Sequence, residues 1–330
     1  MQRFTLAMLF AFGSSAALAQ TPAPQPDSTL DAYASAARRV DIGAGRSLNL
    51  RCSGETGPSV LLEAGFGADS LAWSKLQPML AKRMRVCSYD RAGYGFSDAG
   101  PLPRNLEAEV ADLHALVEAA DLPMPAIFVG HSLGSNIVRR YDELHSDDVS
   151  ALVLVDPPPQ DVGAFSADYA KVEKEMAPAM LAAYRRCEQG AKDGKLAARP
   201  PELQSCLRGP NPAYSDKLNA AIRQYRSAPP FWSTILSGSE AKLELFDAPV
   251  PATERHGDKP VIVLTAVDAY AGAEPADRKA LEAARNQTHA ALVATSSRGK
   301  RIEVGKTSHD LQLDDPQAVF DAIVRASEAR

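Results

Sequence analysis

The chain has 330 residues, 45% of them hydrophobic and 23% charged, and its formal net charge is −5. This composition is that of a globular protein, and it excludes the disordered and fibrous classes. No basic block is present, which argues against nucleic acid or an anionic membrane surface as a partner. The length allows one large domain with an insertion, or two smaller domains.

The N-terminus has the pattern of a secretory signal peptide over residues 1–19. Arg3 precedes an apolar run at 4–12, and small residues follow up to an Ala-x-Ala site that ends at Ala19. The apolar run is too short to span a bilayer. We therefore expect an exported protein, periplasmic or secreted, with no stable membrane anchor after cleavage. Residues 20–37 begin with a polar, proline-rich stretch and are expected to form a flexible linker.

Four cysteines remain after the signal pattern, at Cys52, Cys87, Cys187 and Cys206. Disulfides form in exported proteins, and four cysteines allow three pairings. We expect Cys52 to pair with Cys87 because both lie near strands of one sheet. Cys187 and Cys206 would then close a local loop. The spacing matches no zinc pattern, so no metal is expected.

Strand-like apolar segments alternate with amphipathic helical segments along most of the chain. Strands are expected at 39–42, 47–52, 58–64, 84–89, 125–130, 149–156, 260–265 and 300–304. Helices are expected at about 72–82, 105–120, 133–144 and 275–296, and a last one begins at Asp315-Pro316, a cap residue followed by proline. Several strands are apolar throughout, which predicts a mostly parallel sheet covered on both faces.

The alternation is interrupted between residues 157 and 257. This stretch is rich in helix formers, proline and charge and has no strong strand pattern, so it predicts a helical cap. The core would then consist of residues 38–156 and 258–330. We find no internal repeat.

One short motif carries the strongest chemical signal, Gly130-His131-Ser132-Leu133-Gly134. It joins an apolar strand directly to a helix. Small neighbours permit such a sharp turn, and the turn lifts the serine hydroxyl above the sheet edge. The helix N-terminus also offers unpaired N–H groups to a developing oxyanion. The pattern therefore predicts a nucleophilic serine.

Four motifs in chain order resemble those of the α/β-hydrolase superfamily. They are Glu63-Ala64-Gly65-Phe66-Gly67, the loop Asp90-Arg91-x-Gly-x-Gly-x-Ser97-Asp98, Gly130-x-Ser132-x-Gly134 and Ser308-His309-Asp310. The resemblance covers nearly the whole chain after the signal pattern. It implies an α/β fold with a mostly parallel eight-stranded sheet flanked by helices. It also implies an antiparallel edge near the start of the sheet and a helical cap inserted after the sixth strand.

A serine nucleophile needs a base, and the chain has six histidines. His309 lies in the loop between the last strand and the last helix, where the family places its base. His131 adjoins Ser132, but adjacent residues on a sharp turn point in different directions, so we assign it a structural role. His114 lies within a helix and is interpreted as a surface or partly buried residue.

Two aspartates are candidates for the carboxylate that orients the base. Asp268 lies beyond the 260–265 strand, where most relatives carry the acid, but the glycine usual before the acid is missing there. Asp156 ends the strand after the nucleophile, where a minority of relatives carry theirs, and it emerges from a rigid strand end. We favour Asp156 slightly and keep Asp268 as the alternative.

The resemblance also implies the oxyanion donors, which are the backbone N–H groups of Leu133 and Phe66. Relatives usually carry His-Gly in the Phe66 loop, whereas this chain has Ala64-Gly65. The loop 90–98 is interpreted as structural, with Arg91 tying loops together, because its spacing fits no phosphate-binding motif.

The aromatic pair Phe231-Trp232 lies late in the cap. It is a candidate for lining a substrate pocket under the cap, and packing within the cap core is the competing interpretation.

Together these features predict an exported serine hydrolase that cleaves a small carboxylic ester through an acyl-enzyme on Ser132, with His309 as general base. No metal or organic cofactor is implied. The same residues could instead serve amide or peptide hydrolysis or acyl transfer. A binding module with a degenerate site is the alternative from outside the enzymes. Epoxide and haloalkane hydrolysis are disfavoured because those relatives carry an aspartate where this chain has Ser132.

Overall fold

The structure is a computed structural model that describes residues 26–329, apart from the side chains of residues 243 and 244. The predicted signal peptide at 1–19 lies outside the described residues.

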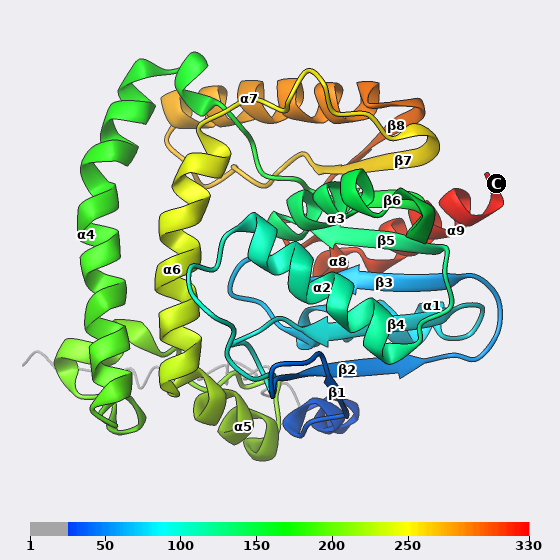
Figure 1. Ribbon diagram of the computed structural model, residues 1–330. Coiled ribbons are helices and arrows are strands. Elements are labelled where there is room, and N and C mark those ends of the chain that lie inside the picture. Colours follow the sequence, from blue (N-terminus) through cyan, green and yellow to red (C-terminus); the bar gives the residue numbers. More distant parts are fainter. Residues whose placement is uncertain (1–25, 330) are drawn as a thin grey trace, which may run out of the picture.

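The core is one eight-stranded sheet with the strand order β1-β2-β4-β3-β5-β6-β7-β8 (Figure 1). The strands are β1 Arg38–Asp41, β2 Ser47–Ser53, β3 Ser59–Glu63, β4 Arg85–Asp90, β5 Ala126–His131, β6 Val149–Val155, β7 Gly257–Ala266 and β8 Ser296–Val304. The β1–β2 and β2–β4 pairs are antiparallel and the other pairs are parallel. The predicted eight-stranded sheet with an antiparallel edge is confirmed.

Helices cover both faces of the sheet, and the cap stands beside it. They are α1 Gln77–Leu80, α2 Leu106–Ala120, α3 Leu133–Leu144, α4 Ala167–Lys192, α5 Asp216–Arg226, α6 Pro229–Phe246, α7 Pro275–Ala294, α8 Leu311–Asp314 and α9 Pro316–Glu328. Three of them, α4 to α6, lie between β6 and β7, as predicted for a cap inserted after the sixth strand. In Figure 1, α6 lies between the core and the outer helix α4.

The apolar strands are buried on both sides because their side chains alternate between two cores. Leu61 and Phe128 point into a core shared with α2 and α3. Their neighbours Val60 and Ile127 point into a second core shared with α1 and α9. A strand flanked by two cores has no solvent face, so the alternation of polar and apolar residues disappears from its sequence.

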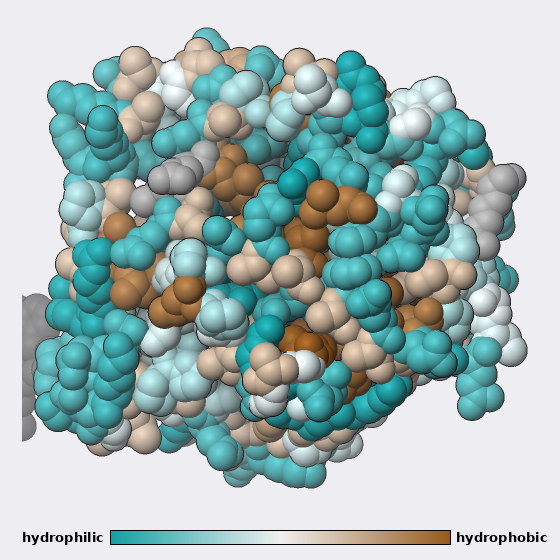
Figure 2. Space-filling model, in the orientation of Figure 1, coloured by the Kyte–Doolittle hydropathy of each residue, from teal (hydrophilic) through white to brown (hydrophobic). Residues whose placement is uncertain are grey.

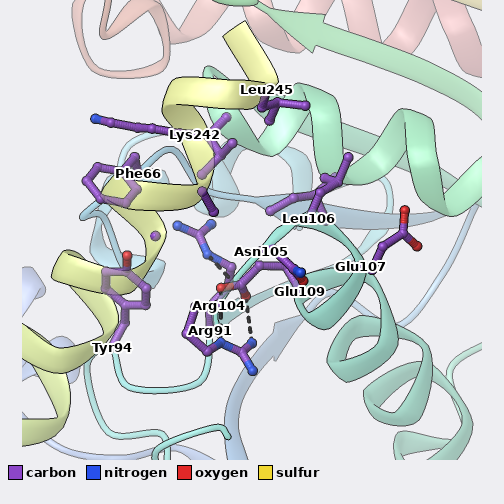
Figure 3. A pocket seen from close by; sticks show the side chains of 14 residues that line it. Phe66, Arg91, Tyr94, Arg104, Asn105, Leu106, Glu107, Glu109, Lys242 and Leu245 are labelled. Carbon is purple, nitrogen blue, oxygen red and sulfur yellow. Dashed lines mark hydrogen bonds and ion pairs between the residues drawn. The ribbon is translucent and has the colours of Figure 1, made fainter. Parts of the chain in front are cut away.

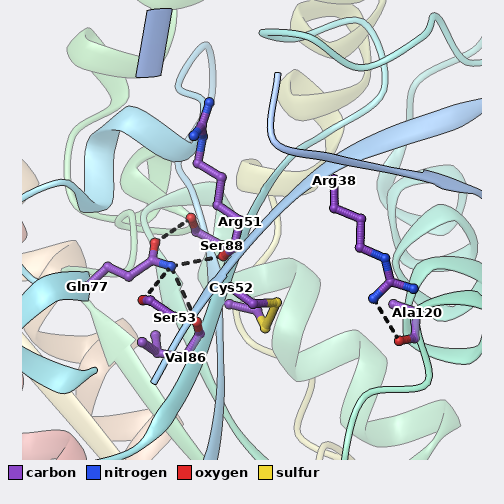
Figure 4. Close-up of a disulfide and its surroundings, with 9 residues drawn as sticks. Arg38, Arg51, Cys52, Ser53, Gln77, Val86, Ser88 and Ala120 are labelled. Atoms are coloured by element: carbon purple, nitrogen blue, oxygen red, sulfur yellow. Dashed lines mark hydrogen bonds between the residues drawn. A yellow bond between two sulfur atoms is a disulfide. The ribbon is translucent and has the colours of Figure 1, made fainter. Parts of the chain in front are cut away.

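Both expected disulfides are present. Cys52 and Cys87 are directly opposed in the register of β2 and β4, where their Cα atoms are 4.1 Å apart (Figure 4). Cys187 on α4 is bonded to Cys206, and both are buried in the cap core. The second disulfide therefore ties the long outer helix to the segment that follows it.

The flexible linker predicted at 20–37 is wrong for its described part. Residues Ser28–Ala34 form a 3₁₀ helix that packs against α5 of the cap. The Asp27 N–H donates to the Ala213 carbonyl at 3.2 Å, and the Arg51 guanidinium lies 4.7 Å from the centre of the Tyr33 ring. Composition predicted a linker, but contacts with a distant part of the chain order this segment.

The helix predicted at 72–82 is also wrong in extent. The segment forms a 3₁₀ turn at Ser70–Trp73 and a single α-helical turn at Gln77–Leu80. Pro78 lies in the first turn of α1, because proline has no N–H to donate within a helix.

A buried ionic network joins α3 to the start of β7, with His256 at its centre. His256 lies 2.6 Å from Asp142 and 3.1 Å from Glu254, and its side chain is fully buried. Burial lowers the pKa of His256, but the hydrogen bonds to both carboxylates outweigh burial and leave it raised. The charged form is therefore favoured in the folded protein.

We expect His256→Gln to cost more stability at about pH 6 than at about pH 9. A raised folded-state pKa contributes stability that is fully present below the unfolded pKa of about 6.5 and is lost as the pH rises through the folded value. At about pH 6 the substitution should lower the free energy of unfolding by about 3 kcal/mol, because two buried carboxylates lose a charged partner. Urea unfolding of both proteins at the two pH values measures this. Equal losses would contradict it.

Within residues 26–329, no helix combines the length and the apolar character needed to cross a membrane. The face shown in Figure 2 is largely hydrophilic, with separate apolar patches over and between the cap helices and the α2–α3 pair.

Candidate active site

The turn between β5 and α3 holds Ser132 in a strained backbone conformation, with φ 52° and ψ −124°. Close packing around the turn maintains this strained conformation. A Cβ on Gly130 would lie only 2.4 Å from the Gly134 carbonyl oxygen. A Cβ on Gly134 would lie 2.4 Å from the carbonyl oxygen of Glu63. Both glycines are therefore required by their neighbours, and the turn presents Ser132 at the carboxyl edge of the sheet.

His309 lies in the loop before α8 and is paired with Asp156. Its Nδ1 is 2.7 Å from Asp156 Oδ2. Asp156 is 1% exposed and its Oδ1 accepts from the Ala266 N–H at 3.0 Å, whereas 42% of the His309 side chain is exposed. A buried, fixed carboxylate thus holds an imidazole that still reaches solvent. This arrangement suits a general base.

Asp268 occupies a different place. It is exposed, and its Oδ2 accepts from the Lys306 N–H at 2.6 Å. It therefore accepts a hydrogen bond from the backbone of the loop that carries His309, and among the described residues no hydrogen bond or ion pair joins Asp268 to the imidazole.

His131 contacts the backbone of the loop that carries His309. Its Nε2 lies 2.9 Å from the His309 carbonyl oxygen, and the centres of the two imidazole rings are 4.8 Å apart. Burial, together with His309, lowers the pKa of His131 to about 4, so the ring is neutral near pH 7. A neutral ring that donates from Nε2 leaves Nδ1 as an acceptor, and Gln312 Nε2 lies 3.5 Å from it. This geometry agrees with a structural role.

Phe66 and Leu133 flank the turn, and a buried arginine fixes the Phe66 loop. Arg91 Nη1 donates to the Ala64 carbonyl at 2.5 Å, and Nη2 donates to the Gly65 carbonyl at 2.6 Å. Its charge is paired with Glu63 at 2.5 Å. Burial raises the pKa of Glu63, and Arg91 opposes that rise. The guanidinium therefore ties the 90–98 loop to the Phe66 loop, the role expected of it.

The Phe66 loop also lies against the nucleophile. A Cβ on Gly65 would be 3.2 Å from Ser132 Cβ and 2.9 Å from His131 Nδ1. The loop thus approaches Ser132 as closely as a glycine permits. Among the described contacts, Ser132 Oγ has no hydrogen bond to His309. In ligand-free enzymes such catalytic hydrogen bonds are often long and tighten with substrate.

Phe231 and Trp232 do not line the site. They are 7% and 6% exposed, and they pack in the cap core beside Tyr94 and Cys187. Trp232 Nε1 donates to the Arg226 carbonyl at 2.9 Å, so its polar atom is satisfied within the cap. The pocket interpretation of this pair is corrected to cap packing.

One group of three side chains in residues 26–329 could hold a metal ion. The ligand atoms of His114, His145 and Asp148 lie within 4.8 Å of one another. This cluster adjoins the C-terminal end of α3, whereas Ser132 lies at its N-terminal end, and 12 helical residues rise about 18 Å. The cluster is therefore separate from the Ser132 site.

The supporting contacts of His131, Gln312 and the Ala266 N–H were not found from sequence. His131 could have been suspected from its place beside Ser132. Gln312 and Ala266 carry no local signal, because their contacts join segments far apart in the chain.

Comparison with known proteins agrees with this geometry. Residues 60–322 match the model of the alpha/beta hydrolase family. The chain is 32% identical to the uncharacterized protein YqjL of Bacillus subtilis over 113 residues, which are 34% of this chain and 45% of the relative. It is 38% identical to the pimeloyl acyl-carrier-protein methyl ester esterase of Chromobacterium violaceum over 104 residues, 32% of this chain and 39% of that one. The matched regions thus span less than half the length of these relatives.

The fold is similar to that of the serine hydrolase involved in carbazole degradation, with a TM-score of 0.61 and 18% identity. That likeness covers 89% of this chain and 98% of the solved one. An eight-stranded sheet, a strained serine turn and a family match over most of the sequence lead to one conclusion. The chain belongs to the alpha/beta hydrolase family.

Proposed function

We propose that this hydrolase cleaves small carboxylic esters through an acyl-enzyme on Ser132. The observation that carries the proposal is the 2.7 Å contact between His309 Nδ1 and the buried Asp156, next to the strained serine turn. A positioned carboxylate, an imidazole and a raised hydroxyl are the parts that serine acyl transfer needs.

Acylation begins when Ser132 Oγ attacks the ester carbonyl carbon and His309 Nε2 takes the hydroxyl proton. The carbonyl oxygen becomes an oxyanion that accepts from the N–H groups of Leu133 and Phe66. A donor of this kind is worth roughly 3–4 kcal/mol in related chemistry. His309 then returns the proton to the leaving alcohol, and the bond between the carbonyl carbon and the alkoxy oxygen breaks.

Deacylation uses the same groups with water as nucleophile. His309 takes a proton from the water as it attacks the acyl carbon. It then returns that proton to Ser132 Oγ as the bond between the acyl carbon and Oγ breaks and the carboxylic acid leaves. Asp156 stabilises the transient imidazolium, and the neutral His131 ring beside His309 adds no opposing charge.

An ester is favoured over an amide by the activity of one relative, a methyl ester esterase that is 38% identical over 104 residues. The test is a panel of p-nitrophenyl esters of graded acyl length, with labelling by a fluorophosphonate probe mapped by mass spectrometry. Hydrolysis of short esters and modification of Ser132 are expected. A protein that neither turns over any ester nor reacts with the probe would overturn the proposal.

We further propose that the protein acts outside the cytoplasm. The N-terminal signal pattern and the two cysteine pairs support this, since disulfides persist in oxidising compartments. Cell fractionation with an antibody to the chain should find a processed protein beginning near Gln20. Full-length protein in the cytoplasm would contradict it.

Gly65→Ala should lower kcat by about 100-fold while the protein stays folded. The added Cβ would press on Ser132 and His131, and a displacement of about 1 Å at reacting groups is enough for such a loss. Steady-state kinetics and thermal unfolding measure the two effects. Gly272→Ala is the matched control, because its Cβ meets no atom within 4 Å.

A further inference from the structure

A cavity of about 300 Å³ is lined in part by the two proposed oxyanion residues, Phe66 and Leu133. Figure 3 shows this cavity with Phe66 at its side. The cap helix α6 and the core helices α2 and α3 contribute residues to its lining. Its apolar lining comes from Leu106, Ile137, Ala241 and Leu245. The volume is at the small end of the range for small-molecule sites, so it suits a short substrate group.

Helix α6 lies very close to the Phe66 ring at this cavity. A Cβ on Gly238 would be 2.9 Å from Phe66 Cε2. The position of the cap helix and the position of the Phe66 loop are therefore linked. A side chain one turn further along α6 is brought over the same ring.

That side chain is Lys242, and no described side chain forms an ion pair with it. Among the other charged residues that line the cavity, Arg91, Arg104, Glu107 and Glu109 each lie within 3.1 Å of an opposite charge. No acid whose side chain is described lies within 4.0 Å of Lys242. Its Nζ lies 4.2 Å from the centre of the Phe66 ring (Figure 3).

The surroundings leave this ammonium poorly compensated. Burial lowers the pKa of Lys242, and Glu173 of α4 opposes that shift only from a distance. The ring of Phe66 contributes a cation–π contact worth about 1–2 kcal/mol, less than a desolvated charge loses on leaving water. An anionic ligand group would supply the missing partner.

We propose that Lys242 binds a carboxylate on the substrate, so that the preferred substrates are small esters that carry a negative charge. The inference rests on the proposed ester hydrolysis and names its substrate class. A lysine ammonium is a compact single charge, and the other charged residues that line the cavity are already ion-paired, which suits one carboxylate better than a doubly charged phosphate.

The test compares p-nitrophenyl hemiglutarate with its neutral methyl ester, p-nitrophenyl methyl glutarate, by the ratio of their kcat/KM values. Wild type should prefer the charged ester, and Lys242→Met should lower the ratio by about 10-fold to 100-fold, mainly through KM, since a hydrogen bond to a charged group is worth about 1.5–3 kcal/mol. Lys242→Arg should keep most of the preference. Lys171→Met, an exposed lysine on α4, is the control that leaves the ratio unchanged.

Two results would overturn the proposal. One is a wild-type enzyme without preference for the charged ester. The other is a Lys242→Met variant that loses both esters equally, because that pattern means that Lys242 only supports the Phe66 ring. Hemisuccinate and hemiadipate esters then report which chain length reaches Lys242.

Direct binding separates this inference from the proposed reaction. Calorimetry with glutarate on the Ser132→Ala protein measures the site without turnover. Binding that is lost in the Ser132→Ala, Lys242→Met double variant supports the carboxylate site even if no ester is hydrolysed. Equal binding by both proteins, or none by either, contradicts it.

Discussion

Ser132→Ala is expected to lower kcat for p-nitrophenyl esters by about 10⁴-fold to 10⁶-fold, with no loss of fold. Removing the hydroxyl removes the nucleophile, and only the oxyanion donors and substrate binding remain to accelerate the reaction. Stopped assays with high enzyme concentration, together with fluorophosphonate labelling, measure the residual rate and the loss of the reactive group.

Ser135→Ala is the matched control for this change. Ser135 lies on the same turn, and its hydroxyl donates to the Gly130 carbonyl at 2.8 Å. Its loss should cost about 1 kcal/mol of stability and leave kcat within about tenfold of wild type. A Ser132→Ala protein with full esterase activity would remove the basis of the proposed mechanism.

Asp156→Asn is expected to lower kcat by about 10⁴-fold, the second largest effect. The asparagine oxygen can still accept from the Ala266 N–H, so the amide nitrogen faces His309 Nδ1. That nitrogen donates, which forces Nδ1 to accept and places the imidazole hydrogen on Nε2. An Nε2 that carries hydrogen cannot take the serine proton.

Asp268→Asn should leave kcat within about tenfold of wild type. Its oxygen can still accept from the Lys306 N–H and hold the loop. Measuring both variants on one ester decides which aspartate orients the base. A large loss in Asp268→Asn and a small one in Asp156→Asn would reverse the assignment.

The fold was predictable because its signals are local. Strand residues such as Val60 and Leu61 face opposite cores, so the whole strand is apolar and is visible as a short run. The start of α9 was visible in Asp315-Pro316, where the Asp315 side chain accepts from the Ala318 N–H at 3.0 Å. These features depend on neighbours a few residues away.

The predictions that were wrong share a different origin. Residues 28–34 have the composition of a linker, yet they are ordered by α5, almost two hundred residues later. Phe231 and Trp232 have the composition of a pocket lining, yet the Cys187–Cys206 segment packs over them. The composition of a segment indicates which of its side chains can be buried. The residues that pack against them are defined only in the folded chain.

By itself, the sequence determined the serine turn. Ser132 needs small neighbours at Gly130 and Gly134, and this pattern is visible within five residues. At Gly130 the obstacle to a Cβ is also local, the Gly134 carbonyl oxygen, whereas at Gly134 it is the Glu63 carbonyl oxygen of a distant strand. Only the tertiary structure decided which carboxylate meets His309, because Asp156 and Asp268 are both strand-end residues and the deciding distance of 2.7 Å spans 153 positions. It also decided that Lys242 lies over Phe66. The local sequence around a residue determines its backbone conformation. The group that its side chain contacts depends on distant segments packing together.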